Sequence, residues 1–111
     1  MENKIINTVN EWFPQCMPSD RELSEYKVLQ NVADYCMECL EGSDEEQALA
    51  KEAINIMGIL YYNGSLHIRN AIENEFLERL SKCESPASLK KHMAYMPKEM
   101  RSIYMKTILE N

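Results

Sequence analysis

The sequence predicts an all-α fold, a compact single-domain bundle of about five to six helices that spans residues 1–111. Three observations support this fold class. Apolar residues recur at helical spacing along most of the chain, and no stretch alternates as a β-strand would. Glycine and proline are scarce, with 3 and 4 residues, which leaves little material for tight hairpins. Serine-led capping sequences and prolines mark helix ends at short intervals.

The first helix is expected over residues 3–13 and is ended by Pro14. Its apolar residues at helical spacing are Ile5, Ile6, Val9, Trp12 and Phe13. The second helix is expected from about Asp20 to Glu41, after a capping box at 19–22. Gly42 follows it and suits the left-handed conformation that ends many helices.

The third helix is predicted to begin at a second capping box, Ser43 to Glu46, and to end at Asn63-Gly64. Its expected buried residues are Leu49, Ala53, Ile56, Met57 and Leu60. Ser65 is the predicted cap of the fourth helix. The inner face of that helix should carry Ile68, Ala71, Ile72, Phe76 and Leu80.

Ser85-Pro86 predicts a short fifth helix with Leu89 and Met93, since proline is favoured at the first helical position. Pro97 is expected to start the last helix, whose apolar residues are Met100, Ile103, Tyr104 and Ile108. The short connections make successive helices antiparallel or orthogonal neighbours. A bundle and a stack of orthogonal pairs both stay open.

Charge is unevenly distributed within a net −6. Residues 1–81 carry 15 acidic and 6 basic residues, a net −9, whereas 82–111 carry 3 and 6, a net +3. The acidic part argues against nucleic-acid binding, which requires a basic footprint. It fits a partner with a basic face, although acidic charge also keeps a protein soluble.

The longest apolar segment, 53–62, is too short for a membrane span and contains Asn55. No secretory signal precedes the first predicted helix. We therefore expect a cytoplasmic protein that does not enter a membrane and whose four cysteines are reduced thiols.

Two sets of residues are candidates for partner binding. Glu38, Glu41 and Glu45 belong to an acidic run around the turn between the second and third helices. Capping and the helix dipole explain the acids that open the third helix, but a docking role for the corner is a further interpretation. Tyr61 and Tyr62 are the second set, because tyrosine is enriched at interfaces. Tyrosine at the edge of a core is the alternative explanation.

Metal or redox chemistry is a less favoured hypothesis. Cys36 and Cys39 form a CxxC pair, and a metal site would need further ligands from residues such as His67 or His92. The pair lies far along a predicted helix, whereas a redox CxxC usually opens one. We therefore expect buried structural thiols and histidines at the surface or rim. No catalytic or cofactor motif is recognisable, which predicts a protein that is not an enzyme and holds no cofactor.

Residues 63–80 carry a resemblance. They run from an Asn63-Gly64 turn, through an Asn-x-Ile pattern at Asn70, to a Phe-Leu-Glu pattern that ends at Glu78. This segment resembles an element of small bacterial all-helical proteins of unknown function, and the proline-led last helix fits the same likeness loosely. The resemblance implies a compact helical bacterial domain with no established activity, so it carries no functional residues over.

These observations favour a protein-binding module, such as an acidic inhibitor or an immunity-type protein that neutralises a basic toxin. The alternative is a structural helical domain that associates with itself as a homo-oligomer. The 8 methionines and the tyrosines support this alternative, because such side chains form adaptable interfaces.

Overall fold

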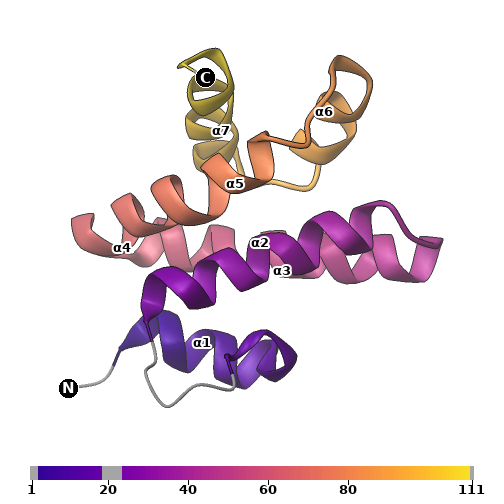
Figure 1. Cartoon of the computed structure of the whole chain (residues 1–111). Helices are drawn as coiled ribbons and strands as arrows, with labels where there is room; N and C mark the ends of the chain where they lie inside the picture. Colours follow the sequence, from indigo (N-terminus) through magenta and orange to yellow (C-terminus); the bar gives the residue numbers. More distant parts are fainter. Residues whose placement is uncertain (1–2, 19–23, 111) are drawn as a thin grey trace.

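The part of the chain that the structure describes, residues 3–18 and 24–110 of a computed structural model, contains helices and no strand. Helix α2 (Glu25–Leu40) and helix α3 (Asp44–Asn63) form an antiparallel pair joined by a short turn (Figure 1). The predicted all-α fold is therefore confirmed.

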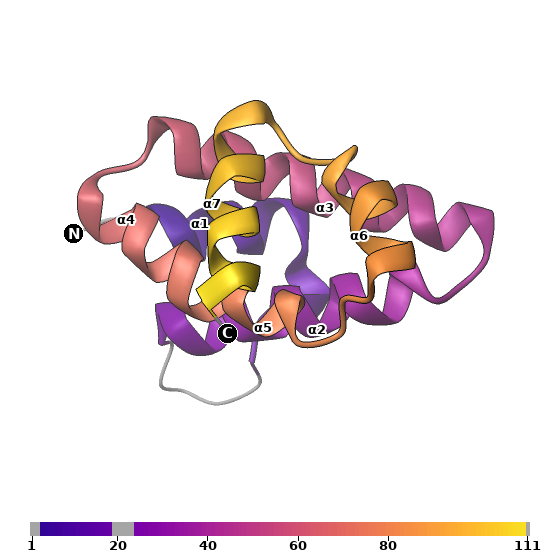
Figure 2. The same ribbon diagram turned by 90° about the horizontal axis from the view of Figure 1, so that it is seen from above.

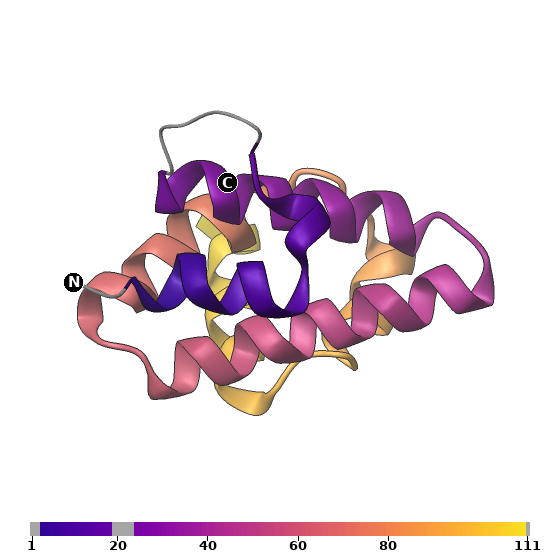
Figure 3. The same cartoon turned by 90° about the horizontal axis from the view of Figure 1, so that it is seen from below.

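The other helices cover the two sides of the α2–α3 pair. On one side lie α1 (Lys4–Trp12) and the short 3₁₀ turn η1 (Pro14–Cys16), as Figure 3 shows from below. The opposite side carries the elements α4 (Leu66–Ala71), η2 (Ile72–Leu77), α5 (Glu78–Ser81), α6 (Pro86–Met93) and α7 (Lys98–Glu110). In Figure 2, seen from above, α7 runs across the α2–α3 pair, so the helices do not form a simple parallel bundle.

Helix α1 follows the sequence prediction closely. The Asn3 side-chain oxygen accepts a hydrogen bond from the Ile6 amide at 3.1 Å and thereby caps the helix. Ile5, Val9 and Phe13 are buried, as their spacing predicts. Trp12, however, is half-exposed, because it lies at the edge of the face that α1 presents to its neighbours.

Helix α2 begins later than predicted, at Glu25 rather than near Asp20. Ser24 is extended and its hydroxyl accepts the Lys27 amide at 3.5 Å, so Ser24 is the cap. The capping box predicted at 19–22 lies outside the described residues. The left-handed conformation predicted for Gly42 is wrong: its φ is not positive, and its amide closes the turn by a 3.1 Å bond to the Cys39 carbonyl.

Helix α3 opens with the predicted capping box between Ser43 and Glu46. Ala53, Met57 and Leu60 of the predicted face are buried, as expected, and Ile56 is half-buried. Leu49, however, is exposed, whereas Ala50 and Ile54 are fully buried. Helix α3 packs against α2, α4 and α7, so several neighbours together select its buried face.

Residues 66–81 form one continuous helix in which Ile72–Leu77 adopts the π conformation. Ser65 caps it, as predicted, by accepting the Ile68 amide at 3.3 Å. The wider π turns let Ile72, Phe76 and Leu77 all face the core together with Leu80. Of the predicted inner residues, Ala71, Ile72, Phe76 and Leu80 are buried, and Ile68 is half-buried against the core.

The last two helices begin where the prolines predict. Pro86 is the first residue of α6, with Ser85 as its cap, and α7 follows Pro97 directly. Pro97 packs against Gly58 in the interior of α3: a methyl group added at Gly58 would overlap Cγ of Pro97. This close approach fixes the start of α7 on α3.

Candidate functional site

Four carboxylates project from the turn between α2 and α3, and we call Glu38, Glu41, Asp44 and Glu45 the acidic corner. All four side chains are exposed. None of them forms a hydrogen bond or an ion pair with another described residue. The neighbouring Glu46 differs, because its Oε1 accepts the Ser43 amide at 3.1 Å in the capping box. The acidic corner is therefore a free negative surface within the described chain.

The helix dipole explains only half of this corner. Asp44 and Glu45 lie in the first turn of α3, where the positive end of the dipole stabilises a carboxylate. Glu38 and Glu41 lie at the C-terminal end of α2, where the negative end of the dipole disfavours one. Helix stability therefore gives no reason for Glu38 and Glu41.

Tyr61 and Tyr62 do not lie on the same surface as the acidic corner. They are at the opposite end of α3, about 24 Å along the helix from Glu45. Tyr61 is only 7% exposed, whereas Tyr62 is 60% exposed. Of this pair, only Tyr62 can reach a partner without rearrangement.

Tyr61 instead contributes to the internal structure. Its hydroxyl donates a 2.8 Å hydrogen bond to Oε2 of Glu73 in the π segment, and the Arg69 guanidinium lies over its ring. Burial, together with the Glu73 carboxylate, raises the pKa of Tyr61 to about 12. This side chain connects α3 to the helix that follows.

The cysteines of the CxxC pair are buried, as expected. Cys36 is fully buried, and Cys39 is nearly so, beside the buried Cys16 of η1. Burial raises the pKa of Cys16 to about 11, with a smaller contribution from Cys39, and it also raises the pKa of Cys36. Raised pKa values keep thiols protonated and unreactive. Among residues 3–18 and 24–110, no three His, Cys, Asp or Glu side chains are placed to hold a metal ion.

The two histidines have different environments. His67 is exposed, as predicted, but the prediction that His92 lies at the surface is wrong. The His92 side chain is 10% exposed because α6 turns it toward the Glu84 carboxyl group, whose side chain is 3% exposed. Sequence patterns could not reveal this pair, because Glu84 lies in a connection and no motif marks it.

Glu84 is the centre of a buried polar cluster. Its Oε1 lies 2.6 Å from Nδ1 of His92 and accepts the Tyr104 hydroxyl at 2.8 Å. Its Oε2 accepts the Ser88 hydroxyl at 2.5 Å. Burial and the bond to Glu84 raise the pKa of Tyr104 well above its ordinary value. The cluster is closed on itself, and its contacts give it a structural role.

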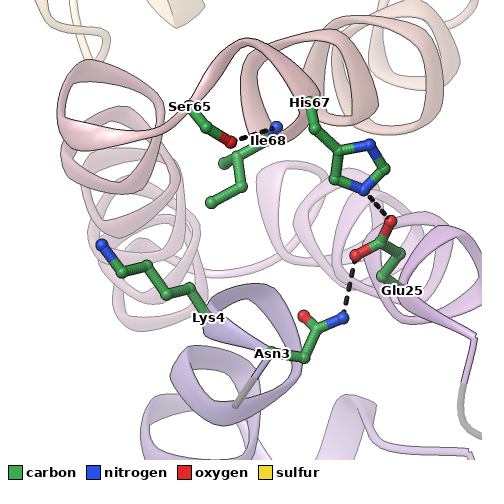
Figure 4. A pocket seen from close by; sticks show the side chains of 6 residues that line it. All are labelled: Asn3, Lys4, Glu25, Ser65, His67 and Ile68. Carbon is green, nitrogen blue, oxygen red and sulfur yellow. Dashed lines mark hydrogen bonds and ion pairs between the residues drawn. The ribbon is translucent and has the colours of Figure 1, made fainter. Parts of the chain in front are cut away.

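The second cluster lies where three helices begin (Figure 4). The Glu25 carboxylate at the start of α2 pairs with Nε2 of His67 in α4. It also accepts a 2.9 Å hydrogen bond from the side-chain amide of Asn3, the N-cap of α1. An open hollow of about 480 Å³ beside it is also lined by Lys4, Ser65 and Ile68. The Glu25 carboxylate lies where the positive ends of three helix dipoles meet and already supplies the anion that they favour. Its contacts with His67 and Asn3 therefore join the three helices.

Comparison with models of protein families identifies a family. Residues 6–110 match a domain of unknown function, DUF7674. The chain belongs to the DUF7674 family. The likeness predicted from residues 63–80, to a family of proteins of unknown function, is thereby confirmed; a bacterial source stays a prediction. The comparison with curated proteins and the comparison with solved structures give no match for this DUF7674 chain.

The structure thus separates the predicted site residues of the DUF7674 chain into two regions. Glu38, Glu41 and Glu45 are brought together at one end of α3, and Tyr62 is left at the other. The described part of the DUF7674 chain contains no helix long and apolar enough to cross a membrane. Of the two regions, the acidic corner is the one that several unpaired charges share.

Proposed function

We propose that this DUF7674 chain is a non-catalytic protein-binding module whose acidic corner docks on a basic face of another protein. An inhibitor of the immunity type, which neutralises a basic toxin, is the form of this function that the small size and acidic charge favour. A cytoplasmic location is part of the proposal. It is supported by the four cysteines, which are all unpaired, because thiols stay reduced in that compartment.

One observation carries the proposal: Glu38 and Glu41 are exposed, have no partner among residues 3–18 and 24–110, and lie where the helix dipole disfavours them. Beside Asp44 and Glu45 they also repel one another. A basic partner relieves both effects, since each carboxylate gains an opposite charge on binding. Such a surface also speeds encounter with a positively charged partner.

The test is affinity capture from the lysate of the source organism with wild-type protein and two variants. The first variant carries Glu38→Gln, Glu41→Gln and Glu45→Gln. The control variant carries Glu11→Gln, Glu52→Gln and Glu99→Gln, which removes the same charge from exposed positions elsewhere.

We expect a basic protein that the wild type and the control variant retain at low salt and the corner variant does not. High salt should release it, because salt screens exposed charges. A partner that both variants retain equally contradicts the proposed role of the corner.

Self-association is a second candidate function, and a different surface supports it. Trp12 of α1 and Ile59 of α3 are both half-exposed, and with Ile56 and Leu60 they line an apolar hollow of about 270 Å³. Exposed apolar patches often mark interfaces. Trp12 is the one tryptophan in the sequence, so its emission reports on this patch alone.

Sedimentation across a range of concentrations, with Trp12 emission measured in parallel, tests this candidate. Self-association through the patch predicts a dimer whose formation shifts the emission to shorter wavelength and which Ile59→Lys abolishes. A monomer at every concentration contradicts it.

A further inference from the structure

A groove with an apolar floor separates α6 from α7, and these helices stand apart on one side of the α2–α3 pair (Figures 1 and 2). Its volume is about 410 Å³. The lining residues come from one face of each helix: Pro86, Leu89, Lys90 and Met93 from α6 together with its C-cap Ala94, and Arg101 and Met105 from α7. The groove is separate from the acidic corner.

The apolar strip of this groove is only partly covered by the fold. Leu89, Met93 and Met105 are half-buried, so each still presents apolar surface to the groove. One turn beyond Met105, Leu109 is 78% exposed and extends the strip along α7. Methionine side chains are flexible and adapt to varied apolar partners, and they are common in grooves that bind helices.

Both walls of the groove carry a positive charge. Lys90 on α6 and Arg101 on α7 are exposed, and neither side chain is paired with a carboxylate of the described residues. They belong to the basic part of the sequence, 82–111, which has a net +3. The charge of the groove is therefore opposite to that of the acidic corner.

We propose that this groove binds an amphipathic α-helix of another protein, with an apolar face flanked by carboxylates. Apolar residues at positions i, i+4 and i+7 of that helix would cover Leu89, Met93 and Met105. Glutamate or aspartate on its flanks would pair with Lys90 on one wall and Arg101 on the other. Helix α6 is 8 residues long and lines the groove along its length, so the groove accommodates about two turns of such a helix.

The experiment is a selection of displayed helical peptides of about 16 residues, long enough to form a helix on binding, against the full chain. We expect enriched peptides to combine an apolar face with acidic flanks. Their affinities are then measured by fluorescence anisotropy. Amide chemical shifts of the labelled chain should move at residues 86–109.

Two double charge-reversal variants test whether the peptides bind in the groove. Lys90→Glu with Arg101→Glu should weaken binding of the enriched peptides by roughly tenfold or more, through loss of two pairs and gain of two repulsions. The control variant carries Lys27→Glu and Lys82→Glu, at exposed positions outside the groove. Its affinity for the same peptides should stay within about twofold of that of the wild type. The corner variant should still bind, which separates this proposal from the proposed function.

Several results overturn the groove assignment. They are a selection without enrichment, enrichment of basic peptides, equal binding to the Lys90–Arg101 variant, and chemical shifts confined to the acidic corner. A wild-type dimer that the same variant dissociates also overturns it, because a second copy of the chain would then occupy the groove.

Discussion

Nδ1 of His92 in α6 lies 2.6 Å from Oε1 of Glu84, in the connection that precedes this helix. The same oxygen accepts a hydrogen bond from Tyr104 of α7 at 2.8 Å. One buried carboxyl group therefore contacts both helices that form the walls of the apolar groove. The Glu84 side chain therefore links the two walls through polar contacts.

Glu84→Ala should lower the free energy of unfolding by about 2–4 kcal/mol, because it leaves two buried side chains, His92 and Tyr104, without their partner. The measurement is urea unfolding followed by circular dichroism. Glu52→Ala, at an exposed position in the interior of α3, is the control and should change stability by less than about 0.5 kcal/mol. Equal changes in the free energy of unfolding for the two substitutions would show that the Glu84 cluster does not stabilise the fold.

Alkaline pH should destabilise the protein through Tyr104. Its pKa is raised in the folded state, so the unfolded state loses its proton first. The contribution of the buried Tyr104 hydroxyl to the free energy of unfolding is fully present below the ordinary tyrosine pKa of about 10. It is lost as the pH rises above that value, by up to about 1.4 kcal/mol per pH unit.

Urea unfolding of the wild type and of Tyr104→Phe between about pH 8 and pH 11 tests this, because tyrosine ionises in that range. The wild type should lose stability more steeply than the variant above the ordinary pKa. Parallel curves for the two proteins would contradict the burial of this hydroxyl.

Gly58 offers a test of the α3–α7 contact. Alanine normally stabilises a helix interior relative to glycine by about 1 kcal/mol. Here Gly58→Ala should instead destabilise the protein by about 1–3 kcal/mol, because the new methyl group meets Pro97. Asn55→Ala, on the exposed side of α3, should be neutral or stabilising. If Gly58→Ala were more stable than the wild type, Pro97 could not pack against Gly58 as described.

The four cysteines should differ in reactivity. Cys83 is exposed, whereas Cys16, Cys36 and Cys39 are buried. A chromogenic thiol reagent at neutral pH should therefore modify one thiol per chain in the native protein and all 4 after unfolding in urea. Cys83→Ser should remove the native reaction. Rapid modification of two or more thiols in the native wild type would contradict this packing.

Local chemistry made much of the fold predictable. Ser43, Ser65 and Ser85 each cap a helix, as expected, because a cap needs only residues within one turn of the chain. The same rule misplaced the start of α2, where Ser24 rather than Ser19 precedes the described helix. Two serines with the sequence pattern of a cap lie close together there, and local patterns do not rank them.

Features that depend on distant residues were not predictable. The exposure of Leu49 follows from how α3 packs against α2, α4 and α7. Gly58 is explained only by Pro97, which is 39 positions away. The burial of His92 depends on Glu84, a residue with no recognisable motif. The acidic corner was predictable because one turn brings its residues together, whereas the groove between α6 and α7 needed the folded chain.

The most direct test of the central claim is the association rate between the captured partner and the chain, measured by stopped-flow at low and high salt. If the acidic corner docks on a basic face, the rate should fall with salt and fall by roughly tenfold in the corner variant at low salt, since opposite charges steer encounter. The control variant should match the wild type to within about twofold, because its charges lie away from the interface. An association rate that is equal in all three proteins and independent of salt would contradict the account.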